Sequence, residues 1–286
     1  MVHIAIPEPT SPQFVPDSAA YNQRSLPQYL HALISAGATP IPVPLHESPQ
    51  RVARILATCH GILLPGSPAD IDPQTYGQLP NGSEPPDPAR AAVDELLLQD
   101  AFNLHKPILA ICQGLQALNT WRNGTLIQDI PTQVGAAPRS PRTGLGPWGV
   151  VNHSPGRAIL EAHPIQITPN TRLSSIFETV RAPHISKLRD GSDASQPEHL
   201  PEYVNSSHHQ AIQTPGDNLL ISAISPQDQV IEAVELNSAD HFVLAVQWHP
   251  ERSYNQSAFS RAIFHAFVQA AQSWTPRKIE ESVLHV

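Results

Sequence analysis

The feature of this 286-residue sequence that most limits its fold is a rhythm of short apolar runs that alternate with stretches of helical spacing. In the first half of the chain the runs occupy residues 2–6, 41–45, 61–65 and 107–112, and the helical patterns occupy 29–37, 50–58, 87–103 and 113–121. Uninterrupted apolar strands alternating with helices are typical of a parallel sheet that is covered on both faces. The sequence therefore predicts an α/β fold with a doubly wound, mostly parallel sheet flanked by helices.

The same pattern continues toward the end of the chain and predicts a single domain. Further strands are expected at residues 164–168, 218–223, 230–236 and 242–248, followed by a closing helix over 257–272. We therefore expect one domain over residues 1–274 and a loosely held tail over 275–286. Residues 132–156 and 190–201 are polar and rich in Pro, Gly and Ser, which favours loops or insertions.

Composition and charge exclude several classes of protein. The chain has 17 Lys and Arg against 25 Asp and Glu, so it lacks the basic field that collects phosphates, and no nucleic-acid partner is expected. No apolar stretch reaches the roughly 18 to 20 residues of a membrane span, and no signal-peptide pattern opens the sequence. These observations favour a cytoplasmic protein with no membrane partner. The two cysteines are too few for a disulfide scaffold.

Cys112 stands at an abrupt change from strand to helix. The apolar run 107–112 passes directly into the helical pattern 113–121, with no loop residues between them. A thiol at this position is exposed at the strand end, and the helix N-terminus is expected to lower its pKa and to hold a developing oxyanion. The alternative is that Cys112 is a small apolar residue of the core, which is the commoner role of cysteine. Cys59 is interpreted as such a structural residue.

Two further strand ends carry the groups that a cysteine nucleophile needs. The run 242–248 is followed by His249-Pro-Glu251, which would place a general base beside a carboxylate that orients it, on the same sheet edge as Cys112. The run 61–65 is followed by Gly66, whose backbone N–H group could complete an oxyanion hole. Each motif taken alone also fits an ordinary loop or turn.

In this order the motifs resemble the class I glutamine amidotransferase-like superfamily, and within it the γ-glutamyl hydrolases of the γ-glutamyl-γ-aminobutyrate hydrolase type. The segments that carry the resemblance are residues 64–73, 107–129, 204–211 and 246–251. They are spread over nearly the whole chain. The resemblance implies a flavodoxin-like arrangement of the sheet and helices and a hydrolase that needs no cofactor.

The resemblance also implies roles for individual residues. Cys112 would be the nucleophile, His249 the general base and then acid, and Glu251 the residue that orients it. The oxyanion hole would be formed by the backbone N–H groups of Gly66 and Gln113. The residues implied to contact the substrate are Gln116, Ser207, His208 and His209.

The adjacent pair His208-His209 could instead indicate a metal site. No Cys or carboxylate partner stands at ligand spacing from the pair, so no metal is expected. The sequence departs from the resembled pattern at Gln113, where many of these hydrolases have Arg, and at Ser67, where they have a second Gly. The change at Gln113 removes a charge beside the site, which leaves the amine portion of the substrate open.

The activity expected from these residues is hydrolysis of γ-glutamyl amides through a thioester on Cys112. One alternative is a glutaminase subunit that delivers ammonia to a separate synthetase. The other is a catalytically silent homologue that serves as a binding or regulatory protein, although the retention of Cys112, His249 and Glu251 argues against it. The sequence leaves the oligomeric state open, and a homodimer is compatible with it.

Overall fold

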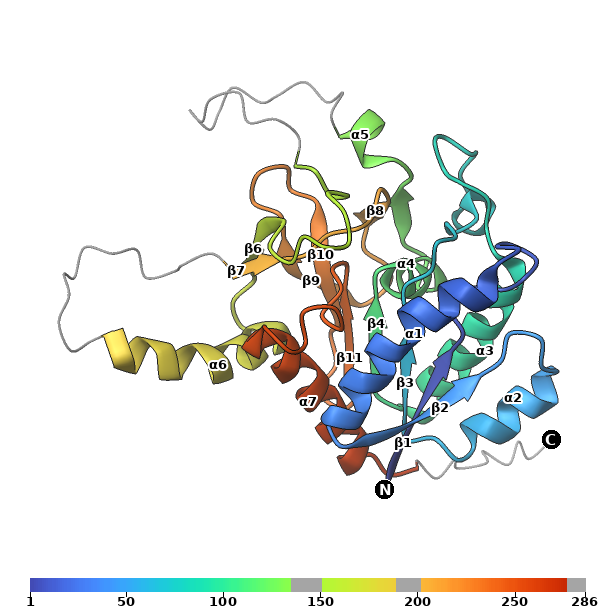
Figure 1. Cartoon of the computed structure of the whole chain (residues 1–286), viewed down its shortest axis with the longest axis horizontal. Helices are drawn as coiled ribbons and strands as arrows, with labels where there is room; N and C mark the ends of the chain where they lie inside the picture. Colours follow the sequence, from blue (N-terminus) through green and yellow to red (C-terminus); the bar gives the residue numbers. More distant parts are fainter. Residues whose placement is uncertain (135–150, 189–201, 277–286) are drawn as a thin grey trace, which may run out of the picture.

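A computed structural model describes residues 1–134, 151–188 and 202–276. The strands are β1 (Val2–Pro7), β2 (Ala38–Val43), β3 (Gly61–Leu64), β4 (Ile108–Ile111), β5 (Thr125–Ile127), β6 (His163–Ile167), β7 (Glu202–Val204), β8 (Ala211–Thr214), β9 (Leu219–Ile224), β10 (Ile231–Leu236) and β11 (Val243–Val246). The helices are α1 (Ser18–Ser35), α2 (Pro49–Leu56), the 3-10 helix η1 (Pro73–Tyr76), α3 (Pro88–Leu104), α4 (Gln113–Trp121), α5 (Ile130–Gln133), α6 (Arg172–Leu188) and α7 (Ala258–Ser273). The strands form one mixed sheet (Figure 1).

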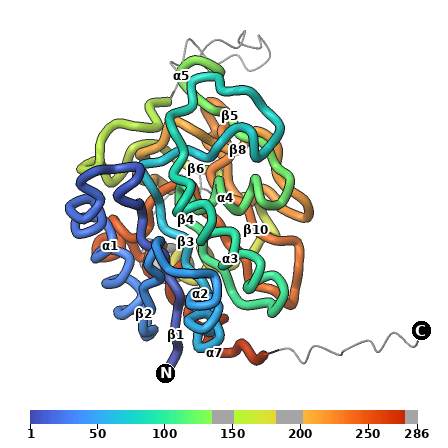
Figure 2. The backbone as a smooth tube through the Cα atoms, turned by 90° about the vertical axis from the view of Figure 1, so that its right-hand side faces the viewer, coloured from blue at the N-terminus to red at the C-terminus, as the bar shows by residue number. Residues whose placement is uncertain are grey.

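The centre of the sheet is parallel, in the order β2-β1-β3-β4-β11. All residues of β3, β4 and β11 are buried, because helices cover both faces of these strands. Helices α1 and α7 pack on one face, and α2, α3 and α4 pack on the other. Figure 2 shows α1 and α3 on opposite sides of β3 and β4. The predicted α/β fold with a doubly wound, parallel centre is confirmed.

Beyond β11 the sheet continues with antiparallel strands, in the order β10-β9-β6-β7, while β8 and β5 branch off at β10. The sequence analysis did not predict the strands β5, β7 and β8, and it did not predict helix α6. Strands β5 and β7 have three residues each, which is too short for an alternating pattern to be recognised. Helix α6 contacts α7 near its start and then extends away from the body of the domain (Figure 1).

Some expectations fall on residues outside the described ranges. The expected loop 132–156 is described at 132–134 and 151–156, and the expected loop 190–201 lies entirely outside. Of the expected tail, residues 275–276 follow the end of α7 without regular structure, and 277–286 are not described. Helices α2, α3, α4 and α7 begin and end within two residues of their predicted limits, as at α3, where Pro88 follows the N-cap residue Asp87. Helix α1 differs, because it begins at Ser18, eleven residues before the predicted pattern 29–37. Its first part has few large apolar residues and contains Pro27, so it shows no apolar periodicity.

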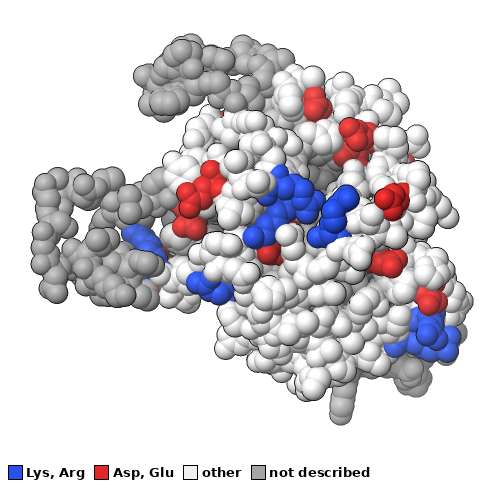
Figure 3. Space-filling model, viewed as in Figure 1, with Lys and Arg blue, Asp and Glu red and all other residues white. Residues whose placement is uncertain are grey.

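The described helices include none that is both long and apolar enough to cross a membrane. The surface carries charges of both signs. On the face seen in Figure 3, a group of Lys and Arg side chains lies near the centre, and Asp and Glu side chains occupy several places around it.

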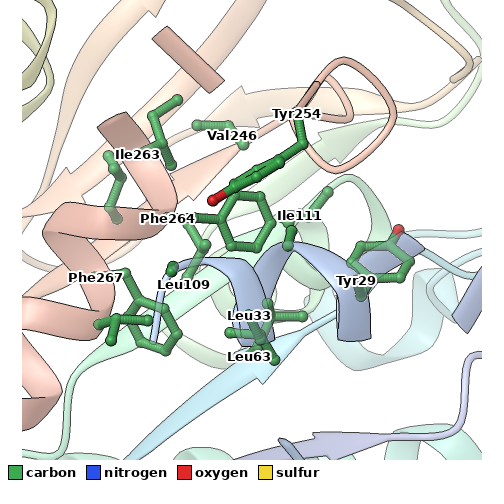
Figure 4. Close-up of a cluster of buried hydrophobic side chains, with 14 of the residues drawn as sticks. Tyr29, Leu33, Leu63, Leu109, Ile111, Val246, Tyr254, Ile263, Phe264 and Phe267 are labelled. Atoms are coloured by element: carbon green, nitrogen blue, oxygen red, sulfur yellow. The ribbon is translucent and has the colours of Figure 1, made fainter. Parts of the chain in front are cut away.

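Aromatic and branched side chains fill the space between the parallel strands and the helices α1 and α7. Figure 4 shows Phe264 and Phe267 of α7 facing Leu109 of β4, with Leu33 and Tyr29 of α1 completing the cluster. Four of these residues are 0 % exposed, and Tyr29 is 2 % exposed. This packing fixes α1 against the sheet, and it places Tyr29 beside the carboxyl end of β4.

On the opposite face, Gly114 allows α4 to start directly on top of β3. A Cβ atom at this position would overlap the carbonyl and side chain of Leu64. The chain therefore turns from β4 into α4 without a spacer, as the sequence analysis expected from the absence of loop residues.

A buried arginine connects the amino-terminal loop with the end of β3. Arg90 is 0 % exposed, and its guanidinium binds Asp94 Oδ1 at 2.7 Å, the carbonyl of Pro9 at 3.1 Å and the carbonyl of Pro65 at 2.7 Å. Pro65 directly precedes the turn at Gly66. Because every partner is buried, removing the guanidinium would leave a carboxylate and two carbonyl groups without a donor.

We predict that Arg90→Leu lowers the free energy of unfolding by about 3–5 kcal/mol, because it breaks a buried ion pair by removing one partner. Arg51→Leu is the matched control, because Arg51 and Glu47 form a pair with the same helical spacing whose side chains are 59 % and 28 % exposed. The control change should cost less than about 1 kcal/mol. Urea denaturation measures both values, and equal losses in the two variants would contradict the prediction.

Candidate active site

The pairing of β4 with β11 brings the candidate nucleophile and base to one edge of the sheet. Val246 lies beside Ile111 in the parallel register, and the Cys112 N–H group donates to the carbonyl of Val246 at 2.8 Å. Cys112 has φ 55° and ψ −110°, a conformation that residues with a Cβ atom rarely adopt. The backbone is strained here because Cys112 alone separates the end of β4 at Ile111 from the start of α4 at Gln113.

His249 is fixed both through its ring and through its backbone. Its Nδ1 donates to Glu251 Oε1 at 2.8 Å. The Asn205 side chain donates to the carbonyl of His249 at 2.8 Å and accepts from its N–H group at 2.9 Å. Glu251 thus holds the proton on Nδ1, and Nε2 is left with a lone pair that can accept a proton.

Gly66 lies between the two reactive side chains. A Cβ atom built at Gly66 would lie 2.9 Å from His249 Cε1 and 3.4 Å from Cys112 Cβ. The Gly66 N–H group, which the sequence analysis assigned to the oxyanion hole, donates to the Tyr29 hydroxyl at 3.0 Å. That hydroxyl also lies 3.4 Å from His249 Nδ1. Tyr29 therefore occupies the position at this N–H group where an oxyanion would be expected.

Arg252 contacts the base directly. Its Nη2 donates to His249 Nε2 at 3.0 Å, and its Nη1 donates to Ser207 Oγ at 2.8 Å. Among the hydrogen bonds of the described residues, none joins Cys112 Sγ to His249. In this arrangement the lone pair of the base is engaged by a guanidinium.

Burial dominates the acid–base properties of the site. It raises the pKa of the Cys112 thiol to about 12, although the Arg252 charge acts in the opposite direction. Burial also lowers the pKa of His249 below its ordinary value, although Glu251 opposes this. Burial alone would raise the pKa of the Glu251 carboxyl. The nearby His249 and Arg252 together outweigh burial and hold this pKa below its ordinary value.

The Gln113 N–H group at the start of the helix acts to lower the pKa of Cys112, as expected, but it does not set the net direction. The thiol is 6 % exposed, and the cost of placing a thiolate away from water exceeds the favourable contributions of Arg252 and of the Gln113 N–H group. At neutral pH the thiol and the imidazole are both uncharged.

Cys112 and His249 line a cavity of about 130 Å³. Two of its lining residues are arginines, Arg157 and Arg252, so positive charge reaches the cavity even though Gln113 itself carries none. The other lining residues are Tyr21, Ser25, Tyr29, Ser67, Pro68 and Ser207. A small cavity with two guanidinium groups suits a ligand that carries a carboxylate.

The residues expected to contact the substrate are separated by the fold. Ser207 lines the cavity. Gln116 is buried, does not line the cavity, and donates to Gln210 O and to Gln247 Oε1. His208 is turned toward Glu232, and His209 is turned toward Asp70 and Asp129. Neither imidazole lines the cavity with Cys112.

The sequence analysis did not identify four residues of the site: Tyr29, Arg157, Asn205 and Arg252. Arg252 directly follows Glu251, so its position in the motif was a usable signal. Tyr29 lies in an ordinary helical pattern, and nothing in the sequence relates it to Gly66. Cys59, interpreted as structural, is buried, and its thiol donates to the carbonyl of Ile55 at 3.3 Å.

Comparison with known proteins shows the family to which the chain belongs. The sequence pattern of the family described as Peptidase C26 matches residues 4–251. The chain belongs to the peptidase C26 family. It is thus a glutamine amidotransferase-like hydrolase by descent, as the resemblance noted in the sequence implied.

Several curated proteins are similar to the chain in sequence. It is 32 % identical over 247 residues to "Gamma-glutamyl-gamma-aminobutyrate hydrolase PuuD" of Escherichia coli K12, with 86 % of this chain and 85 % of that protein covered. It is 32 % identical over 252 residues to "Putative glutamine amidotransferase Rv2859c" of Mycobacterium tuberculosis, with 87 % and 68 % covered. It is 28 % identical over 251 residues to "Protein NtpR" of Enterococcus hirae, with 84 % and 87 % covered.

Among solved structures, the fold is similar to that of a "putative gmp synthase subunit a protein" from Thermoplasma acidophilum. The TM-score is 0.52, the sequence identity is 13 %, and 96 % of each chain is covered. This likeness supports the α/β fold of the peptidase C26 member described here and, at this identity, supports the fold alone.

We predict that iodoacetamide alkylates Cys112 slowly at pH 7, and that the rate rises about tenfold for each pH unit up to pH 10, because the reactive thiolate stays a minor species below a pKa of about 12. Free cysteine, whose rate levels off near pH 9, is the reference. Peptide mapping by mass spectrometry separates Cys112 from Cys59. A rate that is already constant at neutral pH would show a stabilised thiolate and contradict the prediction.

Proposed function

We propose that the protein is a cytoplasmic, cysteine-dependent hydrolase that cleaves γ-glutamyl amides through a γ-glutamyl thioester on Cys112. The observation that carries the proposal is the convergence of Cys112, the His249–Glu251 pair and two arginines on one cavity. The relative from Escherichia coli named as a γ-glutamyl-γ-aminobutyrate hydrolase supports the substrate class. Both cysteines are free thiols, which fits a reducing compartment.

In the proposed reaction, His249 Nε2 takes the proton from Cys112 Sγ while the sulfur attacks the amide carbon. The carbonyl oxygen becomes an oxyanion that the Gln113 N–H group stabilises, and collapse of this intermediate expels the amine, which receives the proton from His249. Water, deprotonated by the same imidazole, then hydrolyses the thioester and releases glutamate and the thiol. Glu251 keeps the imidazole in the required tautomer throughout.

We further propose that the substrate itself prepares the base. The α-carboxylate of a γ-glutamyl group is a better partner for Arg252 than an uncharged imidazole is, because it carries the opposite charge and can accept two parallel N–H bonds from the guanidinium. Pairing of this carboxylate with Arg252 and Arg157 would draw the guanidinium away from His249 Nε2. The released lone pair would then be available to the Cys112 thiol.

Hydrolysis of a set of amides, measured by the release of the amine or of ammonia, tests the proposal. The set contains γ-glutamyl-γ-aminobutyrate, γ-glutamyl amides of simple amines, glutamine, and a 4-aminobutanoyl amide that lacks the α-carboxylate. We expect hydrolysis of γ-glutamyl amides, a loss of at least about 100-fold in kcat/KM for the 4-aminobutanoyl analogue, and a loss of at least about 10⁴-fold for Cys112→Ala. Mass spectrometry of quenched reactions should show a γ-glutamyl adduct on Cys112.

The result can contradict the proposal in two ways. Hydrolysis that survives in Cys112→Ala would exclude this residue as the nucleophile. Hydrolysis of glutamine alone would favour a glutaminase that supplies ammonia to a synthetase. Cys59→Ala is the control for loss of a buried thiol outside the cavity, and it should retain the wild-type rate.

The pH dependence of kcat/KM is predicted from the environment of His249. The base must be uncharged to accept a proton, so activity should fall on the acid side as the imidazole becomes protonated. Because the pKa of His249 is lowered by burial and by the Arg252 charge, this fall should lie below pH 6.5. In Arg252→Gln the positive charge is absent, and the fall should move to higher pH.

Arg51→Gln serves as the control, because Arg51 lies on the exposed side of α2 and its loss should leave the profile unchanged. A profile of Arg252→Gln that coincides with the wild-type profile would show that the guanidinium does not act on the base.

A further inference from the structure

Outside the lining of the cavity, four polar side chains from distant parts of the sequence meet in the interior. They are His153, which precedes β6, His163 at the start of β6, His208 between β7 and β8, and Glu232 on β10. Each residue is at most 5 % exposed. One potential ligand atom from each residue lies within 4.8 Å of the ligand atoms of the other three.

The three imidazoles are oriented by hydrogen bonds on their outer nitrogens. His153 Nε2 donates to Asp228 Oδ2 at 2.9 Å. His163 Nδ1 donates to the carbonyl of Pro164 at 3.1 Å, and His208 Nδ1 donates to the carbonyl of Gln210 at 2.9 Å. Histidines that bind metals in proteins are held in this way, with the second nitrogen bonded to a carboxylate or a backbone carbonyl.

The inner atoms of the cluster lack hydrogen bonds. His153 Nδ1, His163 Nε2, His208 Nε2 and both carboxylate oxygens of Glu232 are buried and have no hydrogen-bond partner in the described part of the chain. Carbonyl and carboxylate oxygens only accept, so the outer nitrogens carry the protons and the inner nitrogens of neutral rings present lone pairs. Lone pairs that face a buried carboxylate repel it, and either a second proton on one of the rings or a metal ion between the ligand atoms would remove this repulsion.

We propose that His153, His163, His208 and Glu232 bind one divalent transition-metal ion, and that this ion is Zn²⁺. Three imidazole nitrogens and one carboxylate oxygen form a four-ligand set of the type that zinc adopts in tetrahedral structural sites. Metal–ligand bonds of 2.0–2.1 Å place tetrahedral ligand atoms about 3.3–3.5 Å apart. Glu232 Oε1 lies 3.3, 3.6 and 3.7 Å from the nitrogens of His153, His163 and His208, respectively.

The charges also balance. Glu232 and Asp228 supply two negative charges, one within the ligand set and one behind His153, and together they offset the two positive charges of the ion. Because four protein ligands complete the tetrahedron, no position remains for water or substrate, and the site is structural. His153 and His208 also border a separate cavity of about 270 Å³, which offers the ion a way in.

The expectation of no metal at His208-His209 rested on the lack of a carboxylate or Cys at ligand spacing in the sequence. The fold supplies the missing ligands from residues 153, 163 and 232, and it directs His209 elsewhere, to Asp70 at 3.0 Å. The ion would therefore also have a structural role for the segment 205–210. The ion would anchor this segment at His208, close to Asn205, which holds the backbone of His249.

Metal analysis of the purified protein tests the site without any assay of activity. The protein is produced in zinc-supplemented medium and purified without chelators. Elemental mass spectrometry should find about one zinc ion per chain. Treatment with 1,10-phenanthroline should lower the melting temperature by roughly 5–10 °C, and added Zn²⁺ should restore it. Co²⁺ added to the stripped protein should give the visible absorption of a tetrahedral site.

Two variants locate the ion. His208→Gln should remove the bound zinc, whereas His209→Gln, at the neighbouring position, should keep it. If His208→Gln does not fold, the Co²⁺ spectrum and the chelator response of the wild type decide the matter. The proposal is overturned if the wild type holds no zinc and neither Zn²⁺ nor Co²⁺ changes its melting temperature or spectrum. It is equally overturned if folded His208→Gln retains the metal.

Discussion

The parallel pairing of β4 with β11 is the contact on which the candidate active site depends. It sets Ile111 beside Val246, and the Cys112 N–H group binds the carbonyl of Val246. Both strands are central and buried on both faces, so a slip by one residue would reverse the direction of every side chain and is strongly disfavoured. Cys112 and His249 therefore leave the sheet at a fixed separation, on the edge where parallel α/β sheets bind their ligands.

Exclusion of water then determines the resting state of these groups. Burial favours the uncharged thiol of Cys112 and the uncharged imidazole of His249, while Arg252 and Glu251 provide opposite charges on either side of the ring. In surroundings of low polarity such charges act strongly over short distances. A carboxylate that enters the cavity would therefore change the balance more than the same group would in water, which fits an enzyme whose thiol is unreactive until substrate arrives.

Residues 205–210 connect the candidate active site with the histidine cluster. Asn205 holds His249, Ser207 accepts from Arg252, His208 faces Glu232, and His209 faces Asp70. Neighbouring side chains of this short segment thus contact different sites. Because His208 is only three residues from Asn205, the segment joins the histidine cluster to the backbone of His249 through a short stretch of chain.

The sequence by itself determined the α/β architecture and the positions of Cys112 and of His249-Pro-Glu251 at strand ends, because periodicity and turn residues are local properties of the chain. It did not determine the pKa of Cys112, since burial outweighs the helix terminus. Nor did it reveal the partner of Tyr29 or the meeting of His153, His163 and Glu232 with His208. Only the tertiary structure decided these, because they depend on side-chain directions and on contacts between segments far apart in the sequence.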